Sequence, residues 1–172
     1  PVDAVCDLGD GVEGADARAL DEMIRMQIGQ FARIDAPVYY VMGNHDFDYT
    51  RRSVPRKERL TLPLYEAVRG LAQWHVAESA QDMAFHADVG AFRLYFLTDC
   101  GAEDMSWFLL HEEGLRGDAS RCPHGDAGWR ALRAEIAGCG REVLTLSHYA
   151  LPGGNRASRR FEGLMPLPEN VR

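Results

Sequence analysis

The amino-acid sequence predicts an α/β fold that opens with a strand, a helix and a second strand. Two apolar runs, Val2–Leu8 and Val38–Met42, each lead into a glycine-containing loop. An amphipathic helical pattern over about residues 16–34 separates them, with Asp16 as its N-cap. The order strand, helix, strand predicts a right-handed parallel crossover.

The middle of the chain is predicted to add hairpin strands to this parallel part. Arg51–Arg59 is a charge-rich loop, and Leu62–Leu71 is a short helix. Strands are expected at Trp74–Ala77, Met83–Val89 and Phe92–Thr98, with Gly90 as the turn between the last two. Strands spaced this closely favour antiparallel hairpins.

The last third of the chain is predicted to hold one more helix and one more strand. The segment Glu103–Pro123 is irregular, and Asp126 caps the helix. That helix carries Trp129, Leu132 and Ile136 on one face and is closed by Gly138 and Gly140. The final strand, Val143–Leu146, leads into Ser147-His148, and Gly153–Arg172 is a loop-like tail.

Composition limits the function classes. A length of 172 residues, 46% hydrophobic and 26% charged, suits one globular domain. The net charge of −7 argues against a protein that grips nucleic acid through its phosphates. No apolar run is long enough to span a membrane, and the first residues show no secretory signal. The four dispersed cysteines, Cys6, Cys100, Cys122 and Cys139, predict reduced thiols and a cytoplasmic location.

Polar residues follow three of the predicted strands. Asp10 comes after the first, Asn44-His45-Asp46 after the second and His148 after the last. Open α/β sheets bind ligands outside the carboxyl ends of their strands. A carboxylate, an amide oxygen and an imidazole that meet there form a mixed oxygen and nitrogen site suited to Mn, Fe or Zn.

Each of these residues also has a purely structural interpretation. Asp10 is a possible turn residue, Asn44 a possible left-handed loop residue, and His148 a possible hydrogen-bonded strand-end histidine. Arg51 opens a charge run that either binds substrate phosphate or is solvated. Asn155 and Arg156 are candidates for the mouth of the site. His124 fits a turn before the helix better than a metal cluster.

Taken together, Gly9-Asp10, Gly43-Asn44-His45-Asp46 and Ser147-His148 resemble the GD, GNHD and H blocks of the calcineurin-like metallophosphoesterases. The resemblance spans nearly the whole chain. It implies a four-layer αββα sandwich of two mixed β-sheets with helices outside. It also implies a hydrolase that cleaves a phosphomonoester, phosphodiester or pyrophosphate bond in a small molecule or a nucleotide.

The resemblance assigns roles to individual residues. Asp10 would bridge two divalent or mixed-valence ions (Mn, Fe or Zn), and Asn44 and His148 would bind the second ion. His45 would be a general acid over the phosphate, oriented by Asp46. Two cations about 3.5–4 Å apart clamp a phosphoryl group while a metal-bound hydroxide attacks it.

The chain departs from the family pattern at both ends. The family also has an Asp-x-His block before the GD block and a Gly-His-x-His block after the single histidine, and neither occurs here. Their absence favours a second hypothesis, a non-catalytic member of the fold that binds partners. A nuclease is a third, which the net charge disfavours.

The missing blocks lead us to expect that these 172 residues are a segment of one domain in a longer protein. A first strand absent from beside Val2–Leu8 would leave an open sheet edge, and we expect about 30–50 residues before Pro1 and at least as many after Arg172. The segment alone should be poorly soluble and inactive with added Mn²⁺. The intact mass of the natural protein tests this, and a mass of 172 residues with robust phosphoesterase turnover would contradict it.

Overall fold

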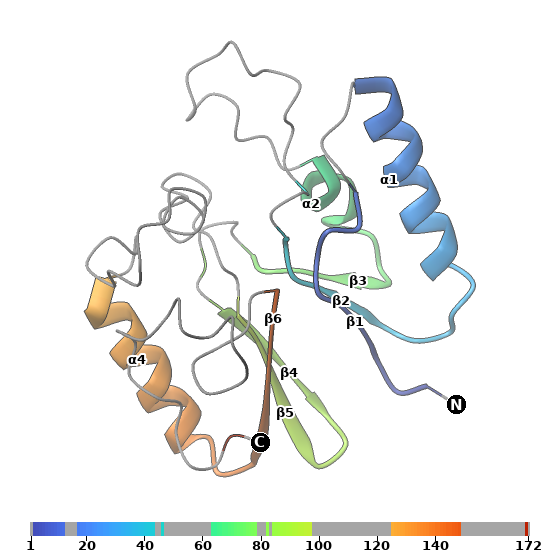
Figure 1. Cartoon of the computed structure of the whole chain (residues 1–172). Helices are drawn as coiled ribbons and strands as arrows, with labels where there is room; N and C mark the ends of the chain where they lie inside the picture. The colour runs from blue at the N-terminus through green and yellow to red at the C-terminus, as the bar shows by residue number, and fades with distance from the viewer. Residues whose placement is uncertain are drawn as a thin grey trace, which may run out of the picture. The chain divides into compact units, whose positions relative to one another are not determined.

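The chain folds into mixed α/β structure built around two small sheets, each of three strands. A computed structural model describes residues 2–12, 17–43, 46, 63–78, 82, 84–97, 125–148 and 171. Two compact units are recognised, Pro1–Ala80 and Gln81–Arg172, and Figure 1 labels the elements of both. The single domain predicted above stays a prediction. Within the described residues, no helix has both the length and the apolar character needed to cross a membrane.

The first unit contains the predicted parallel crossover. Strand β1 (Val5–Asp7) pairs in parallel with β2 (Val38–Tyr40), which pairs in parallel with β3 (Trp74–His75). The strands are shorter than predicted. Pairing continues by one bond beyond β2, since the Val41 amide donates to the Asp7 carbonyl at 2.9 Å. Beyond this bond, each of the two strands leads into its own glycine-containing loop, at Gly9 after β1 and at Gly43 after β2.

Helix α1 (Ala17–Phe31) contacts one buried face of this sheet at its carboxyl end. Val38, Tyr40 and Trp74 share the face because they are in register or two residues apart, and they are at most 5% exposed. Phe31, at the end of α1, contacts Trp74 edge-on with ring centroids 5.2 Å apart. Phe31 belongs to the apolar stripe that predicted the helix, so this end of the stripe contacts the sheet.

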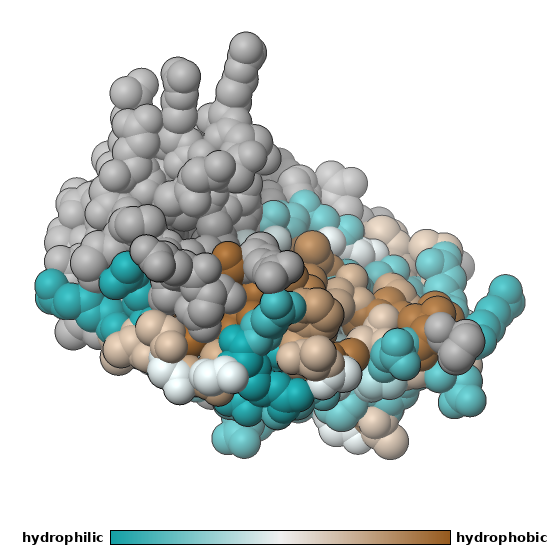
Figure 2. Space-filling view, turned by 90° about the horizontal axis from the view of Figure 1, so that it is seen from below, coloured by the Kyte–Doolittle hydropathy of each residue, from teal (hydrophilic) through white to brown (hydrophobic). Residues whose placement is uncertain are grey.

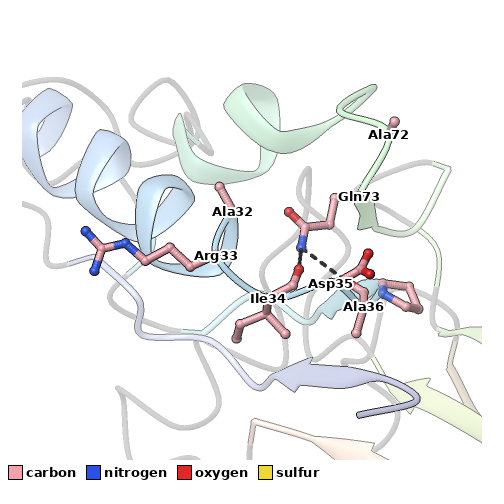
Figure 3. A pocket seen from close by; sticks show the side chains of 8 residues that line it. Ala32, Arg33, Ile34, Asp35, Ala36, Ala72 and Gln73 are labelled. Carbon is pink, nitrogen blue, oxygen red and sulfur yellow. Dashed lines mark hydrogen bonds between the residues drawn. The ribbon is translucent and has the colours of Figure 1, made fainter. Parts of the chain in front are cut away.

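Helix α1 ends three residues earlier than predicted. The Ile34 amide donates to the Phe31 carbonyl at 2.9 Å. The bonded residues are three apart, as in a 3₁₀ turn, whereas those of an α-helix are four apart. The side-chain amide of Gln73, just before β3, donates to the Phe31 carbonyl at 3.0 Å. It also donates to the carbonyls of Ile34 and Ala36 at 2.6 and 3.0 Å (Figure 3). Gln73 thus supplies a donor to carbonyls at the end of α1 and in the turn that follows it.

Helix α2 (Pro63–Val68) is also shorter than its predicted range. It begins with proline at the first helical position, where the missing N–H costs nothing. It ends before Gly70, whose φ of 89° lies in the left-handed region. Its buried residues Leu64 and Val68 face the core of the first unit.

The second unit confirms the predicted hairpin and final strand. Strands β4 (Ala84–Val89) and β5 (Phe92–Leu97) are antiparallel around Gly90, which has a φ of 58°. Strand β6 (Glu142–Ser147) pairs with β5 in parallel over six residue pairs. Thr98 and Met83, at the ends of the predicted strands, lie outside the described residues.

Helix α4 (Gly125–Gly138) connects β5 to β6 and covers one face of their sheet. The core there consists of Tyr95, Leu97, Leu132, Ile136 and Val143. The predicted cap, Asp126, is instead a residue of the helix, which begins at Gly125. A carboxylate is favoured both at an N-cap and in the first turn, so the sequence signal does not separate the two positions.

The remaining predicted segments, Arg51–Arg59, Glu103–Pro123 and all of the tail Gly153–Arg172 except Val171, lie outside the described residues. Val171 forms an isolated parallel bridge with Val143 of β6. On the face shown in Figure 2, hydrophobic and hydrophilic residues are interspersed, as on an ordinary protein surface.

Replacing Gln73 by alanine should lower the free energy of unfolding by about 1–3 kcal/mol, because three carbonyls lose one shared donor. Gln73→Glu should cost at least as much, since it places a negative charge at the carboxyl end of α1. Urea unfolding followed by circular dichroism measures both. Gln30→Ala, an exposed glutamine on α1, is the control, and equal effects at the two positions would refute the role of Gln73.

Candidate functional site

Two glycine loops meet at the carboxyl ends of β1 and β2. The strands are parallel, so both ends lie at the same edge of the sheet. Gly9, with a φ of 91°, is in backbone contact with Gly43. A Cβ atom added to Gly9 would lie 2.8 Å from the Met42 carbonyl carbon and closer still to Gly43. Only glycine permits this approach, which explains why a glycine precedes the polar residue in each loop.

Asp46 holds the two loops together. Its side chain is 1% exposed, and its carboxylate accepts four hydrogen bonds. The donors are the backbone amides of Asp10 (3.0 Å), Val12 (3.2 Å) and Gly43 (2.7 Å) and the hydroxyl of Tyr40 (2.8 Å). The amides of Asp10 and Gly43 and the Tyr40 hydroxyl bond Oδ2, and the Val12 amide bonds Oδ1. The buried charge is thereby compensated by hydrogen bonds.

Asp10 lies at the point where the loops touch. Its φ of 58° is in the left-handed region, which is uncommon for a residue other than glycine. A Cβ atom added to Gly43 would collide with the Asp10 carboxylate and amide. The Asp10 carboxylate therefore lies against Gly43, the residue directly before the predicted ligand Asn44.

The sequence analysis overlooked Asp7, which supports the same loop. Asp7 ends β1 and is 9% exposed. Its carboxylate accepts the Gly9 amide at 3.2 Å and the side-chain amide of Gln27 at 2.8 Å. Burial raises the pKa of Asp7, the two hydrogen bonds oppose that rise, and the negative charge of Asp46 adds to it. An acidic residue inside an apolar strand pattern was the signal that would have revealed it.

Backbone amides in these loops are directed toward the protein's own carboxylates. The amides of Gly9, Asp10, Val12 and Gly43 all donate to Asp7 or Asp46. In a glycine-rich phosphate cradle, such amides point at the ligand instead. A phosphate at this edge of the sheet would therefore have to be held by a cation or by other side chains.

Of the remaining predicted site residues, the structure describes His148. His148 directly follows β6 in the second unit, as expected, and is half-buried. Asn44, His45, Arg51, Asn155 and Arg156 lie outside the described residues, as does His124. The joint cluster of Asp10, Asn44 and His148, and the orientation of His45 by Asp46, stay predictions. Among the residues that are described, no three His, Cys, Asp or Glu side chains converge as metal ligands.

An open pocket of the first unit lies away from these loops. It is lined by residues 32–37 of the turn after α1 and by Ala72 and Gln73 before β3 (Figure 3). These residues precede β2 and β3, so the pocket is at the amino ends of the parallel strands. Ligand sites of parallel sheets form at the opposite ends, where the glycine loops lie.

The chain was compared with known proteins. It matches no model of a known protein family, and it matches no curated protein.

Replacing Asp46 by asparagine should lower the free energy of unfolding by about 2–4 kcal/mol, because one carboxylate oxygen becomes an NH₂ group that faces N–H donors. Tyr40→Phe removes a single donor and should cost about 1 kcal/mol. Denaturant unfolding of the variants measures both. Asp35→Asn, at an exposed aspartate of the same unit, should be close to neutral. An Asp46→Asn variant as stable as this control would contradict the role of Asp46 in holding the two loops together.

Proposed function

We propose that the protein is a metal-dependent phosphoesterase that hydrolyses a phosphomonoester, phosphodiester or pyrophosphate bond. The observation that carries this proposal is the junction of the two glycine loops. Asp46 and the Gly9–Gly43 contact hold the Asp10 carboxylate against the start of the Asn44 loop. Asp10, the candidate acidic ligand, is thereby fixed against Gly43, which directly precedes the candidate amide ligand Asn44 in the sequence.

The chemistry of the donors fits divalent cations. Asp10 supplies anionic oxygen, Asn44 a neutral oxygen and His148 an imidazole nitrogen, a set that suits Mn, Fe or Zn. Four described amides of the loops donate to Asp7 or Asp46, so bound cations would supply the positive charge that attracts a phosphate group. When bound, such cations polarise the phosphoryl group and lower the pKa of the attacking water.

The roles of the protein's own residues follow from this assignment. Asp10 would bridge the cations, and Asn44 and His148 would hold one of them. His45 would give a proton to the departing oxygen as a general acid. Arg51, Asn155 and Arg156 are candidates for contacting the substrate, a phosphate-ester small molecule or a nucleotide. We propose that Asp46 acts mainly by fixing the loops, because it is buried and its carboxylate accepts three backbone amides and the Tyr40 hydroxyl.

We further propose that the complete domain is a four-layer αββα sandwich. Strand β5 supports this because Leu94 to Leu97 are all buried, which requires cover on both faces of the second sheet. Helix α4 covers the face of Tyr95 and Leu97. The opposite face carries Phe85 stacked on Phe96, with centroids 4.7 Å apart. An apolar face of this kind fits packing of sheet on sheet.

A non-catalytic scaffold is the second candidate, and one observation favours it. Asp46 is buried and holds the two loops together, so an aspartate after His45 is needed for folding whether or not the site performs chemistry. His45 thus becomes the residue that separates an enzyme from a scaffold.

The decisive experiment measures metal content and turnover of the natural protein. We expect bound Mn, Fe or Zn and hydrolysis of nitrophenyl phosphate or its diester. His45→Ala should retain its metals and lose about 10²–10⁴-fold in rate, mainly on esters with poor leaving groups. Asp10→Asn should lose metal. A protein without metal or turnover would be a scaffold, and a His45→Ala variant that loses metal and hydrolyses all esters equally poorly would make His45 a ligand.

A further inference from the structure

Helix α1 reaches the loop of Asp10 through one side chain, Gln27. Its amide nitrogen donates to Asp7 Oδ2 at 2.8 Å, and the other oxygen of that carboxylate accepts the Gly9 amide at 3.2 Å. Gln27 and Gly9 are therefore joined through a single buried carboxylate. This links a helix to the residue directly before Asp10.

The same glutamine also packs against the other side of the turn. A Cβ atom added to Gly11 would lie 2.6 Å from the amide nitrogen of Gln27 and 3.0 Å from its Cδ. The Gln27 amide thus lies directly over Gly11. Gln27 is in contact with Gly11 and, through Asp7, with Gly9, the two residues that flank Asp10.

This double support matters because Asp10 has an unfavourable backbone conformation. Its φ of 58° follows a φ of 91° at Gly9. Left-handed conformations of residues other than glycine persist where the surroundings over-determine them. Asp46 fixes the amides of Asp10 and Val12, and Asp7 with Gln27 fixes the residues on either side of Asp10.

A carboxylate at position 7 adds a negative charge beside the loop of Asp10. Burial and the nearby charge of Asp46 raise the pKa of Asp7, whereas the hydrogen bonds from Gln27 and Gly9 oppose that rise and favour the ionised form. The negative charge of an ionised Asp7 would strengthen the electrostatic attraction of the loop for a cation.

We propose that Asp7 and Gln27 are a positioning pair that sets the cation affinity of Asp10 without touching the cation. The inference rests on the proposed function. Side chains that orient metal ligands in this indirect way typically change metal affinity about 10- to 100-fold when they are replaced. We expect a loss of that size for Gln27→Ala and also for Gln27→Met, which keeps the packing over Gly11 but has no donor.

The test is Mn²⁺ binding by the natural protein, followed by electron paramagnetic resonance, together with amide hydrogen exchange of Gly9 in the metal-free protein. Both Gln27 variants should weaken Mn²⁺ binding and speed the exchange of the Gly9 amide. Gln30→Ala on the exposed side of α1 should change neither quantity. Ile24→Val, which lowers stability from the buried side of the same helix, should also leave Mn²⁺ affinity unchanged.

The outcomes separate this inference from the proposed function. Mn²⁺ binding that is lost in Asp10→Asn but unchanged in both Gln27 variants would overturn the positioning pair alone. A natural protein that binds no Mn²⁺ would overturn the proposed function and this inference with it. If Ile24→Val weakened Mn²⁺ binding as much as Gln27→Met, the effect would be one of stability, and the pair would be refuted.

Discussion

The first unit depends on one buried carboxylate. Asp46 lies at the carboxyl edge of the first sheet and accepts hydrogen bonds from two loops that are more than thirty residues apart in the chain. An unpaired charge buried in this way would be strongly destabilising. The four donors offset that cost, and they do so only when both loops are in place. The contact of Gly9 with Gly43 and the left-handed backbone of Asp10 follow from this arrangement.

Three aspartates around one loop have different environments and therefore different uses. Asp46 is buried and bonded to backbone amides of both loops. Asp7 is buried, has a raised pKa and connects the loop to helix α1 through Gln27. Asp10 lies where the loops meet, with its carboxylate against Gly43. Asp7 and Asp46 accept amide donors and support the loop, and Asp10 is the aspartate that we propose as a cation ligand.

Local sequence patterns predicted much of the fold and the candidate positions of the site. The parallel pairing of β1 with β2, the hairpin around Gly90 and the strand before His148 follow from short-range periodicity and glycine turns. The early end of α1 did not, and the turn after it is held by Gln73, which is distant in the sequence. The support of the Asp10 loop by Asp7 and Gln27 escaped prediction for the same reason.

The sequence by itself determined where chain segments form strands and helices and that polar residues follow strands at Asp10, Asn44 and His148. It did so because these features depend on neighbouring residues. Only the tertiary structure decided what each carboxylate binds. The partners of Asp46 and Asp7 include near neighbours in the chain, Gly43 and Gly9, but also distant donors, the Asp10 amide and Gln27. The distant hydrogen bonds require that the strands pair and that α1 packs on the sheet. A carboxylate's role is set by the donors that surround it, and the sequence does not show which distant donors those are.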